Sequence, residues 1–240
     1  MTEPAVGYEG KDLEAMDGAD AYRAWILDLF KPYLGKRIVE VGAGIGSFSK
    51  LLLETSPEKL TLVEPSAMFD RLRNQFGEEA PGTRVKLYNQ LFSDVAGEIR
   101  IQEPDSIIYI NVLEHIEDDI GELGLVRETL APKGRLFLFV PALPFLYSKL
   151  DRHIGHFRRY GRSELREKVA DAGFRILELR WFDMLGIAPW LVKYRLFGSM
   201  TVEAAAVRAY DSIAVPLIRP LENFISPPIG KNLLLIAERD

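Results

Sequence analysis

Short apolar segments of the strand type alternate with amphipathic segments of the helix type along most of the chain. Helices that alternate with strands predict a mostly parallel, doubly wound sheet with helices on both faces, so the fold class expected here is α/β. The segments expected to form strands are 37–41, 59–63, 84–88, 106–110, 135–140, 174–180 and 233–238.

Apolar residues that recur every three or four positions mark the expected helices. Tyr22, Trp25 and Leu29 fall on one face of the first helix, and Asp20 is its expected N-cap. Ser163 is the expected cap of a later helix. The segments expected to be helical are 20–32, 67–76, 118–130, 163–172, 187–197, 201–218 and the residues directly after Gly46.

Two segments do not fit the alternation, a loop insertion at 142–160 and an apolar insertion at 181–231. Ligands bind at the carboxyl edge of such sheets. We therefore expect the second insertion to form a helical cap over that edge. The 240 residues suffice for one domain, 1–240, with an N-terminal helical segment at 1–34.

Three glycines, Gly42, Gly44 and Gly46, lie directly between a strand and a helix. Without a Cβ atom they let the chain turn sharply and let a ligand approach the backbone. The dinucleotide-binding fingerprint would need a glycine where this chain has Ser47, and the phosphate-loop motif is absent. The turn is therefore not well suited to a phosphate.

Two glutamates flank the glycine turn. Glu64 ends the second strand, where a carboxylate suits the two hydroxyls of a ribose. Glu40 precedes the turn, and its negative charge would disfavour a pyrophosphate and favour a ligand that carries an ammonium or sulfonium group.

With these residues the chain resembles the class I S-adenosylmethionine-dependent methyltransferase family, small-molecule type. The motifs that carry the resemblance are VEVGAGIG at 39–46, LVEP at 62–65 and INVLEHI at 110–116. The similarity spans about 22–179, with a last strand introduced by GKNL at 230–233. It implies a Rossmann-like methyltransferase fold, a seven-stranded sheet with an antiparallel last strand, S-adenosylmethionine as cofactor and S-adenosylhomocysteine as product.

The resemblance also implies the cofactor contacts. The glycine turn would hold the methionine moiety, Glu64 the ribose, and Asn111 would lie under the methionine portion. Gln90 or Leu91 would flank adenine, where the family often has an aspartate. A core role for the two aromatic residues of the first helix stays open. The predicted cofactor-binding residues are Glu40, Gly42, Ala43, Gly44, Gly46, Glu64, Pro65, Gln90, Leu91, Asn111, Val112, Tyr22 and Trp25.

The three histidines are the candidate bases. Methyl transfer requires alignment of acceptor, methyl group and sulfur, and an alcohol acceptor also needs a base. His153 and His156 lie in the loop after the fifth strand, and His115 follows the fourth, so all should reach the carboxyl edge. Asp151 could orient one of them. As the catalytic base, His156 is preferred over His153, and His153 over His115. The alternative is that the loop is a solvated or salt-bridged segment with no catalytic role.

The same loop supplies the predicted acceptor contacts. Arg158, Arg159 and Tyr160, with Asp151, suit an anionic or sugar-like acceptor. Trp190 belongs to an apolar helix that could line the acceptor pocket, form a dimer face or lie on a membrane surface. Monomer and homodimer both stay open.

Composition excludes several classes. The chain has no cysteine, so disulfides, thiol catalysis and cysteine-bound metals are excluded. Its net charge of −5 argues against general nucleic-acid binding. Two histidines spaced as HxxH on a loop are poor evidence for a metal-binding site, so no metal site is predicted. No run approaches the roughly 20 apolar residues of a membrane span, and residues 1–14 do not resemble a signal peptide, which predicts a cytoplasmic protein.

The predicted function is therefore methyl transfer from S-adenosylmethionine to a small-molecule, sugar or lipid-linked acceptor, as O-methylation of a hydroxyl assisted by a histidine base. The alternatives are a non-catalytic cofactor-binding module of the same fold and an NAD-dependent oxidoreductase. Ser47 and the NVLEH segment argue against an NAD-dependent oxidoreductase. A protein or nucleic-acid methyltransferase is disfavoured because no recognition domain and no basic surplus are present.

Overall fold

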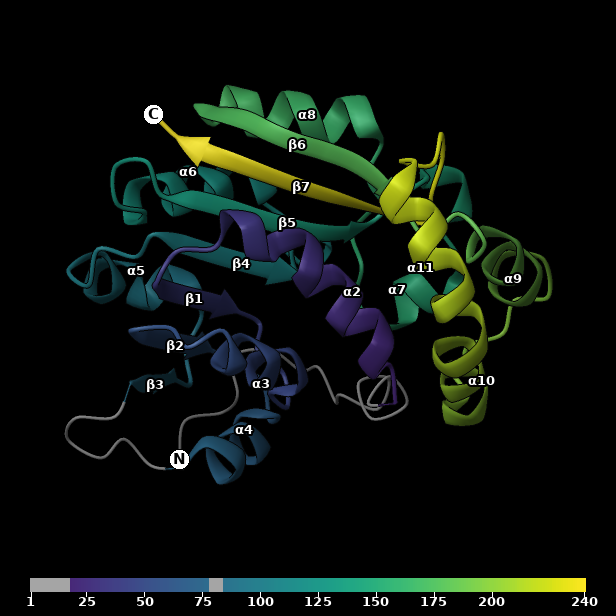
Figure 1. The fold of residues 1–240 in the computed structure, drawn as a ribbon, viewed down its shortest axis with the longest axis horizontal. Coiled ribbons are helices and arrows are strands. Elements are labelled where there is room, and N and C mark those ends of the chain that lie inside the picture. The colour runs from purple at the N-terminus through teal and green to yellow at the C-terminus, as the bar shows by residue number, and fades with distance from the viewer. Residues whose placement is uncertain (1–17, 78–83) are drawn as a thin grey trace.

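The computed structural model describes residues 18–77 and 84–240. A seven-stranded sheet runs through these residues in the order β3-β2-β1-β4-β5-β7-β6 (Figure 1). β7 runs antiparallel to both of its neighbours, β5 and β6, and the other strand pairs are parallel. The predicted fold class is thus confirmed. The strands are β1 (Arg37–Val41), β2 (Lys59–Val63), β3 (Val85–Tyr88), β4 (Ser106–Ile110), β5 (Arg135–Pro141), β6 (Phe174–Phe182) and β7 (Asn232–Arg239).

Helices cover both faces of the sheet. One core cluster joins the sheet to α5, α6 and α8, and the other joins it to α2, α3, α4 and α11. Alternate residues of β5 enter opposite clusters, Leu136 and Leu138 one, Phe137 and Phe139 the other, as the two-residue period of a strand requires. These helices are α2 (Asp20–Phe30), α3 (Ser47–Glu54), α4 (Phe69–Phe76), α5 (Phe92–Arg100), α6 (Asp119–Thr129), α8 (Arg162–Asp171) and α11 (Val215–Phe224).

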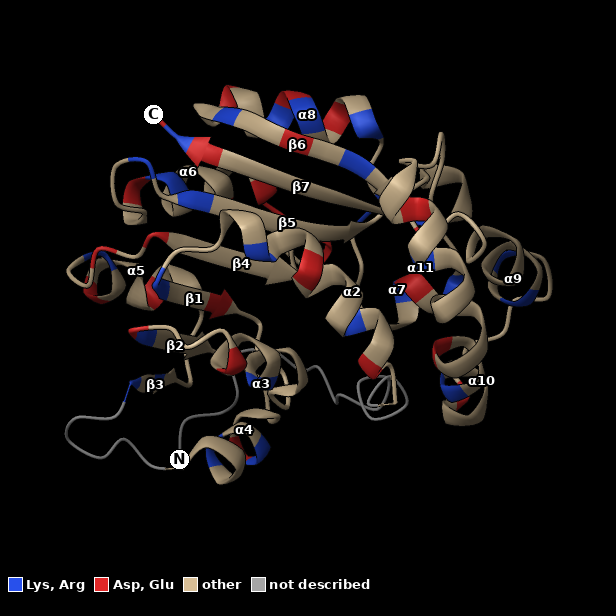
Figure 2. Ribbon diagram, in the orientation of Figure 1, with Lys and Arg blue, Asp and Glu red and all other residues tan. Residues whose placement is uncertain are grey.

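The central strands carry few charges, and charged residues gather on the helices and at strand ends (Figure 2). That distribution fits a sheet buried on both faces. Within the described ranges, no helix is long and apolar enough to cross a membrane. The expectation for residues 1–14, and part of that for 1–34, falls outside the described residues.

Three local expectations were wrong. Asp20 is the first residue of α2 and not its cap: Ala19 holds the cap position, without a side-chain bond. Ser163 lies inside α8, whose N-cap is Gly161, and the Glu164 carboxylate accepts a hydrogen bond from the Gly161 N–H at 3.2 Å. Helix α5 was not predicted. A glycine, Gly97, interrupts its pattern and lowers helix propensity, while tertiary packing stabilises the helix.

Shorter helices gather beyond the carboxyl ends of the strands, at the right of Figure 1. Residues 142–160 form the 3-10 turn η3 (Pro144–Leu146) and α7 (Lys149–His153). We call residues 183–231 the cap. It holds α9 (Ile187–Trp190), the wide turn η4 (Leu191–Leu196), α10 (Ala204–Ala209), the wide turn η5 (Tyr210–Ala214) and α11.

Candidate active site

A pocket of about 500 Å³ lies between the carboxyl edge of the sheet and the cap. Its floor includes Asn111, which follows β4, and Phe139 and Pro141 from β5. Tyr22 of α2 forms part of one wall, and α7 forms part of another. The cap contributes Trp190, Val192, Tyr194, Ala206, Tyr210 and Lys231 among others. The lining is therefore apolar and aromatic, with charged groups at a few points.

The glycine turn adjoins this edge because it follows β1, the neighbour of β4. Gly42, Gly44 and Gly46 have φ angles of +73°, +57° and +88°. A Cβ atom on Gly42 would lie 2.4 Å from a methyl carbon of Val112. The left-handed conformation and the close approach together require glycine at position 42.

Glu64 ties the glycine turn to the end of β2. Its side chain is buried; Oε2 accepts a hydrogen bond from the Gly44 N–H at 2.7 Å, and Oε1 accepts one from the Ser66 N–H at 2.8 Å. Each carboxylate oxygen can accept a second hydrogen bond. The group therefore suits a diol such as the two ribose hydroxyls while it holds the turn in place.

The protonation state of Glu40 differs from the one expected from the sequence. Its side chain is buried and receives a 2.5 Å hydrogen bond from Ser49. Burial raises the pKa of Glu40 to about 8; the Ser49 hydrogen bond opposes this shift and the Glu64 charge adds to it. A carboxyl group with this pKa is mostly neutral at pH 7, so the ligand-free turn carries less negative charge than the sequence suggested.

The other predicted cofactor residues divide between the edge and the core. Asn111 lines the pocket with a left-handed φ of +52°, and Tyr22 lines it too. Trp25 is fully buried in the core, where it stacks on Phe182. Gln90 and Leu91 are exposed two and three residues after the end of β3, Ala43 is buried and Pro65 is half-buried.

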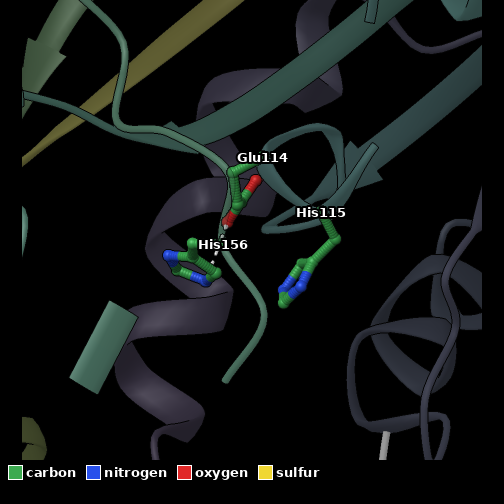
Figure 3. A group of neighbouring side chains, drawn as sticks. All are labelled: Glu114, His115 and His156. Atoms are coloured by element: carbon green, nitrogen blue, oxygen red, sulfur yellow. Dashed lines mark ion pairs between the residues drawn. The ribbon is translucent and has the colours of Figure 1, made fainter. Parts of the chain in front are cut away.

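A carboxylate and two imidazoles meet at the pocket wall (Figure 3). Glu114 and His115 belong to the 3-10 turn η2 (Leu113–His115) after β4, and His156 follows α7. The Glu114 Oε1 atom lies 3.8 Å from Nε2 of His156, and the two rings are nearly perpendicular with centroids 4.6 Å apart. His115 and His156 line the pocket, whereas Glu114 is fully buried behind them.

Burial has the largest effect on the protonation of Glu114 and of His115. It raises the pKa of Glu114 to about 7, an effect that the nearby His156 partly offsets. It lowers the pKa of His115 to about 4, and repulsion from His156 adds to the shift. His115 is therefore a neutral imidazole at pH 7.

Asp151 orients His156. Its Oδ1 atom lies 3.1 Å from Nδ1 of His156 and accepts a 2.8 Å hydrogen bond from Arg159. Its Oδ2 atom accepts one from the Ser148 hydroxyl at 2.7 Å. Burial alone would raise the pKa of Asp151, but these partners outweigh burial and lower it. The carboxylate therefore stays ionised and fixes the ring with Nε2 toward Glu114.

The remaining predicted residues have different surroundings. His153 is exposed on α7 and is not among the residues lining the pocket. Arg158 and Tyr160 both contact Asp119, at 2.7 and 2.9 Å, and neither lines the pocket. Arg159 does line it, and its guanidinium lies 4.3 Å from the centre of the Trp190 ring.

Two residues of the site were not predicted from the sequence. They are Glu114 and Asp183, the buried carboxylate that anchors the cap. Glu114 stood beside His115 in the INVLEHI motif, so a Glu-His pair after the fourth strand was the available signal. The anchor is Asp183, which is fully buried and accepts hydrogen bonds from Tyr22, Tyr210 and Lys231. No local pattern marks it, because its partners come from distant parts of the chain.

Comparisons with known proteins bear on the family and the fold. A family model described as a methyltransferase domain matches residues 15–179. No curated protein matches the chain in sequence. Several solved structures share the fold at low sequence identity.

Three of these structures illustrate the likeness. A chain from the complex of the Haloferax volcanii Trm112 methyltransferase activator with a methyltransferase is 17% identical, with a TM-score of 0.64 over 98% of this chain and 97% of that one. A methyltransferase of Archaeoglobus fulgidus described as SAM dependent is 16% identical, with a TM-score of 0.60 over 92% of this chain and 94% of that one. The Burkholderia thailandensis 1,6-didemethyltoxoflavin-N1-methyltransferase was solved with 1,6-didemethyltoxoflavin and S-adenosylhomocysteine. It is 18% identical, with a TM-score of 0.55 over 100% of this chain and 93% of that one.

Proposed function

We propose that this chain, which belongs to the methyltransferase-domain family, transfers the methyl group of S-adenosylmethionine to a hydroxyl of an acceptor held under the cap. The observation that carries the proposal is one shared pocket. Asn111, which follows the strand beside β1, and His156, with its orienting carboxylate, line the same pocket of about 500 Å³. A methyl donor and an acceptor hydroxyl can therefore meet next to an imidazole.

The residues present fit the cofactor. The three glycines of the turn carry no side chains that would separate a ligand from the backbone, and Glu64 keeps acceptor positions for a diol. When bound, S-adenosylmethionine supplies a methyl group on a sulfonium centre. The acceptor oxygen forms the new C–O bond as the C–S bond breaks, and the sulfonium becomes a neutral thioether.

His156 assists the loss of the hydroxyl proton. Asp151 holds Nδ1, so Nε2 is the nitrogen that can accept the proton, and His115 is the second candidate beside it. Both rings line the pocket that the proposal assigns to the acceptor. Because His153 lies outside the pocket, we do not propose it as the base.

The lining suggests the acceptor class. Trp190, Tyr194 and Tyr210 offer flat apolar surfaces. Arg159 and Lys231, each paired with a buried aspartate, add polar N–H groups to the lining. A small molecule, a sugar or the head of a lipid-linked sugar would use both kinds of contact. A cytoplasmic location, and the choice between monomer and homodimer, stay predictions.

The direct test is product formation. We expect the purified protein, incubated with S-adenosylmethionine and a panel of hydroxylated compounds, to produce S-adenosylhomocysteine and an acceptor heavier by one methyl group in mass spectrometry. Fragmentation should place the methyl on oxygen. Methylation confined to nitrogen, sulfur or carbon would contradict the O-methylation proposal, and cofactor binding without any transfer would favour a non-catalytic module.

Glu64 variants test the cofactor site. Glu64→Ala removes the ribose acceptor and also leaves the Gly44 and Ser66 N–H groups without their partner. We expect calorimetry to show S-adenosylhomocysteine affinity reduced by about 1–3 kcal/mol. Glu64→Gln keeps one carbonyl oxygen and should lose less.

Glu58 is the matched control, since it is exposed just before the opposite end of β2. Glu58→Ala should leave the affinity unchanged. Equal affinities for the wild type and Glu64→Ala would argue against a ribose contact at Glu64.

A further inference from the structure

We propose that Glu114, His115 and His156 form a binding site for a divalent transition-metal ion such as Zn²⁺. The ligand atoms of these three residues lie within 4.8 Å of one another. The proposal rests on the proposed function in one respect, because the ion would face the acceptor pocket and act on its hydroxyl. Binding itself can be measured without any acceptor.

The carboxylate is the first argument. Glu114 has no exposed surface, and neither of its oxygens has a hydrogen-bond partner among the described residues. Buried polar atoms in folded proteins almost always have partners, and a buried carboxylate is costly without one. Figure 3 shows the carboxylate and both imidazoles pointing toward one another. A cation bound among them would supply the missing partner.

The second argument is how each imidazole is held. Nδ1 of His156 faces the Asp151 carboxylate at 3.1 Å, and His115 hydrogen-bonds to the backbone of Gly155. Metal-binding histidines nearly always use one ring nitrogen for a carboxylate or a carbonyl, which orients the other nitrogen toward the ion. Both rings here have that second contact.

The distances set the adjustment that binding requires. Bonds from Zn²⁺ to nitrogen or oxygen are about 2.0–2.2 Å, so two ligands of a tetrahedral ion lie about 3.4 Å apart. The 3.8 Å between Glu114 and His156 is close to that distance. The ligand atoms lie no more than 4.8 Å apart, so binding would require them to close by up to about 1.4 Å through side-chain rotation.

The donor set selects the kind of ion. Two imidazoles and one carboxylate suit Zn²⁺, Fe²⁺, Co²⁺ or Ni²⁺, whereas Mg²⁺ prefers oxygen ligands throughout. Three protein ligands leave at least one coordination position open, as in catalytic sites. Since His115 and His156 line the pocket, the open position would face the acceptor.

An ion at this place would activate the hydroxyl directly. An ion held by Glu114, His115 and His156 would lower the pKa of an acceptor hydroxyl beside it, so the hydroxyl proton would pass to solvent as the C–O bond forms and the C–S bond of the cofactor breaks. The histidines would then act as ligands and would not take the proton themselves. Direct proton acceptance by His156 is the metal-free form of the same activation.

Histidine NMR gives a test on the wild type alone. The chain has three histidines and no cysteine, so tag-free protein freed of metal by a chelator has few competing ligands. We expect one equivalent of Zn²⁺ to shift the imidazole signals of His115 and His156 and to leave those of exposed His153 in place. Equal shifts of all three, or no shift, would overturn the proposal.

Calorimetry of Zn²⁺ binding tests the ligands one by one. Changes to residues that merely support metal ligands weaken binding by about 10–100-fold, so loss of a ligand in Glu114→Gln or His115→Ala should exceed that range. His153→Ala, the matched control on neighbouring α7, should bind as the wild type does. Wild-type affinity in both ligand variants would refute the site.

The metal experiment and the proposed function can fail separately. Loss of S-adenosylhomocysteine binding would contradict the proposed function, whereas Zn²⁺ binding is measured without cofactor or acceptor. Cofactor binding with no stoichiometric Zn²⁺ binding would overturn the metal site alone.

Discussion

His156→Ala is expected to lower kcat by about 10²–10⁴-fold and to leave S-adenosylhomocysteine affinity nearly unchanged, since this is the usual contribution of a positioned base. His156 lies at the acceptor wall, while the glycine turn and Glu64 carry the predicted cofactor contacts. The same loss follows whether the ring accepts the proton or holds an ion. Steady-state turnover and calorimetry on one protein preparation separate the two readouts.

The matched control is His153→Ala. It removes an exposed imidazole three residues away on the same segment, outside the pocket. Turnover should stay at the wild-type level. If His156→Ala also keeps near-normal turnover, the acceptor needs no assistance from this loop, and a nitrogen, sulfur or activated-carbon acceptor becomes the better hypothesis.

Much of the fold could be predicted from the sequence because strand and helix leave periodic patterns. β1, β2 and β4 begin and end at the predicted residues. Helix caps were less predictable, because Asp20 and Ser163 both have the right chemistry but lie one or two residues inside their helices. A cap depends on where the chain enters the helix, and tertiary packing sets that point.

The candidate site was predictable where a motif marks it and not where distant contacts decide. The INVLEHI motif placed His115 at the carboxyl edge. The roles of Arg158 and Tyr160 could not be read locally, because their partner Asp119 lies about 40 residues earlier in the chain. The contact between Glu114 and His156 could not be predicted either, because the two residues lie in loops that are far apart in the sequence.

The anchor of the cap is a buried ion pair. Asp183 has no exposed surface, and its Oδ2 atom lies 2.9 Å from Nζ of Lys231. Lys231 directly precedes β7. It also accepts hydrogen bonds from Tyr22 of α2 and Tyr210 of η5. One carboxylate thus joins α2, the cap and the start of the last strand, and Tyr22, Tyr210 and Lys231 all line the pocket.

Asp183→Asn is therefore expected to lower the free energy of unfolding by about 3 kcal/mol, the lower end for breaking a buried pair, since Lys231 is partly exposed. Asparagine tolerates the left-handed φ of +63° at this position, so the change removes the charge without backbone strain. Urea unfolding at pH 7 measures the loss. Asp171→Ala, on the exposed end of α8, is the control and should stay within about 0.5 kcal/mol of the wild type.

The pH dependence of this loss gives a second check on the ion pair. Burial alone would raise the pKa of Asp183, but Lys231 and the tyrosine hydroxyls outweigh burial and lower it. A carboxylate with a lowered pKa in the folded state stabilises the protein above its unfolded pKa of about 3.9, and that stabilisation is lost as the pH falls through the folded pKa. The difference between wild type and Asp183→Asn should therefore be constant near neutral pH and shrink only in acid below about pH 4. A difference that disappears already at pH 6 would mean that the Asp183 charge does not hold the cap.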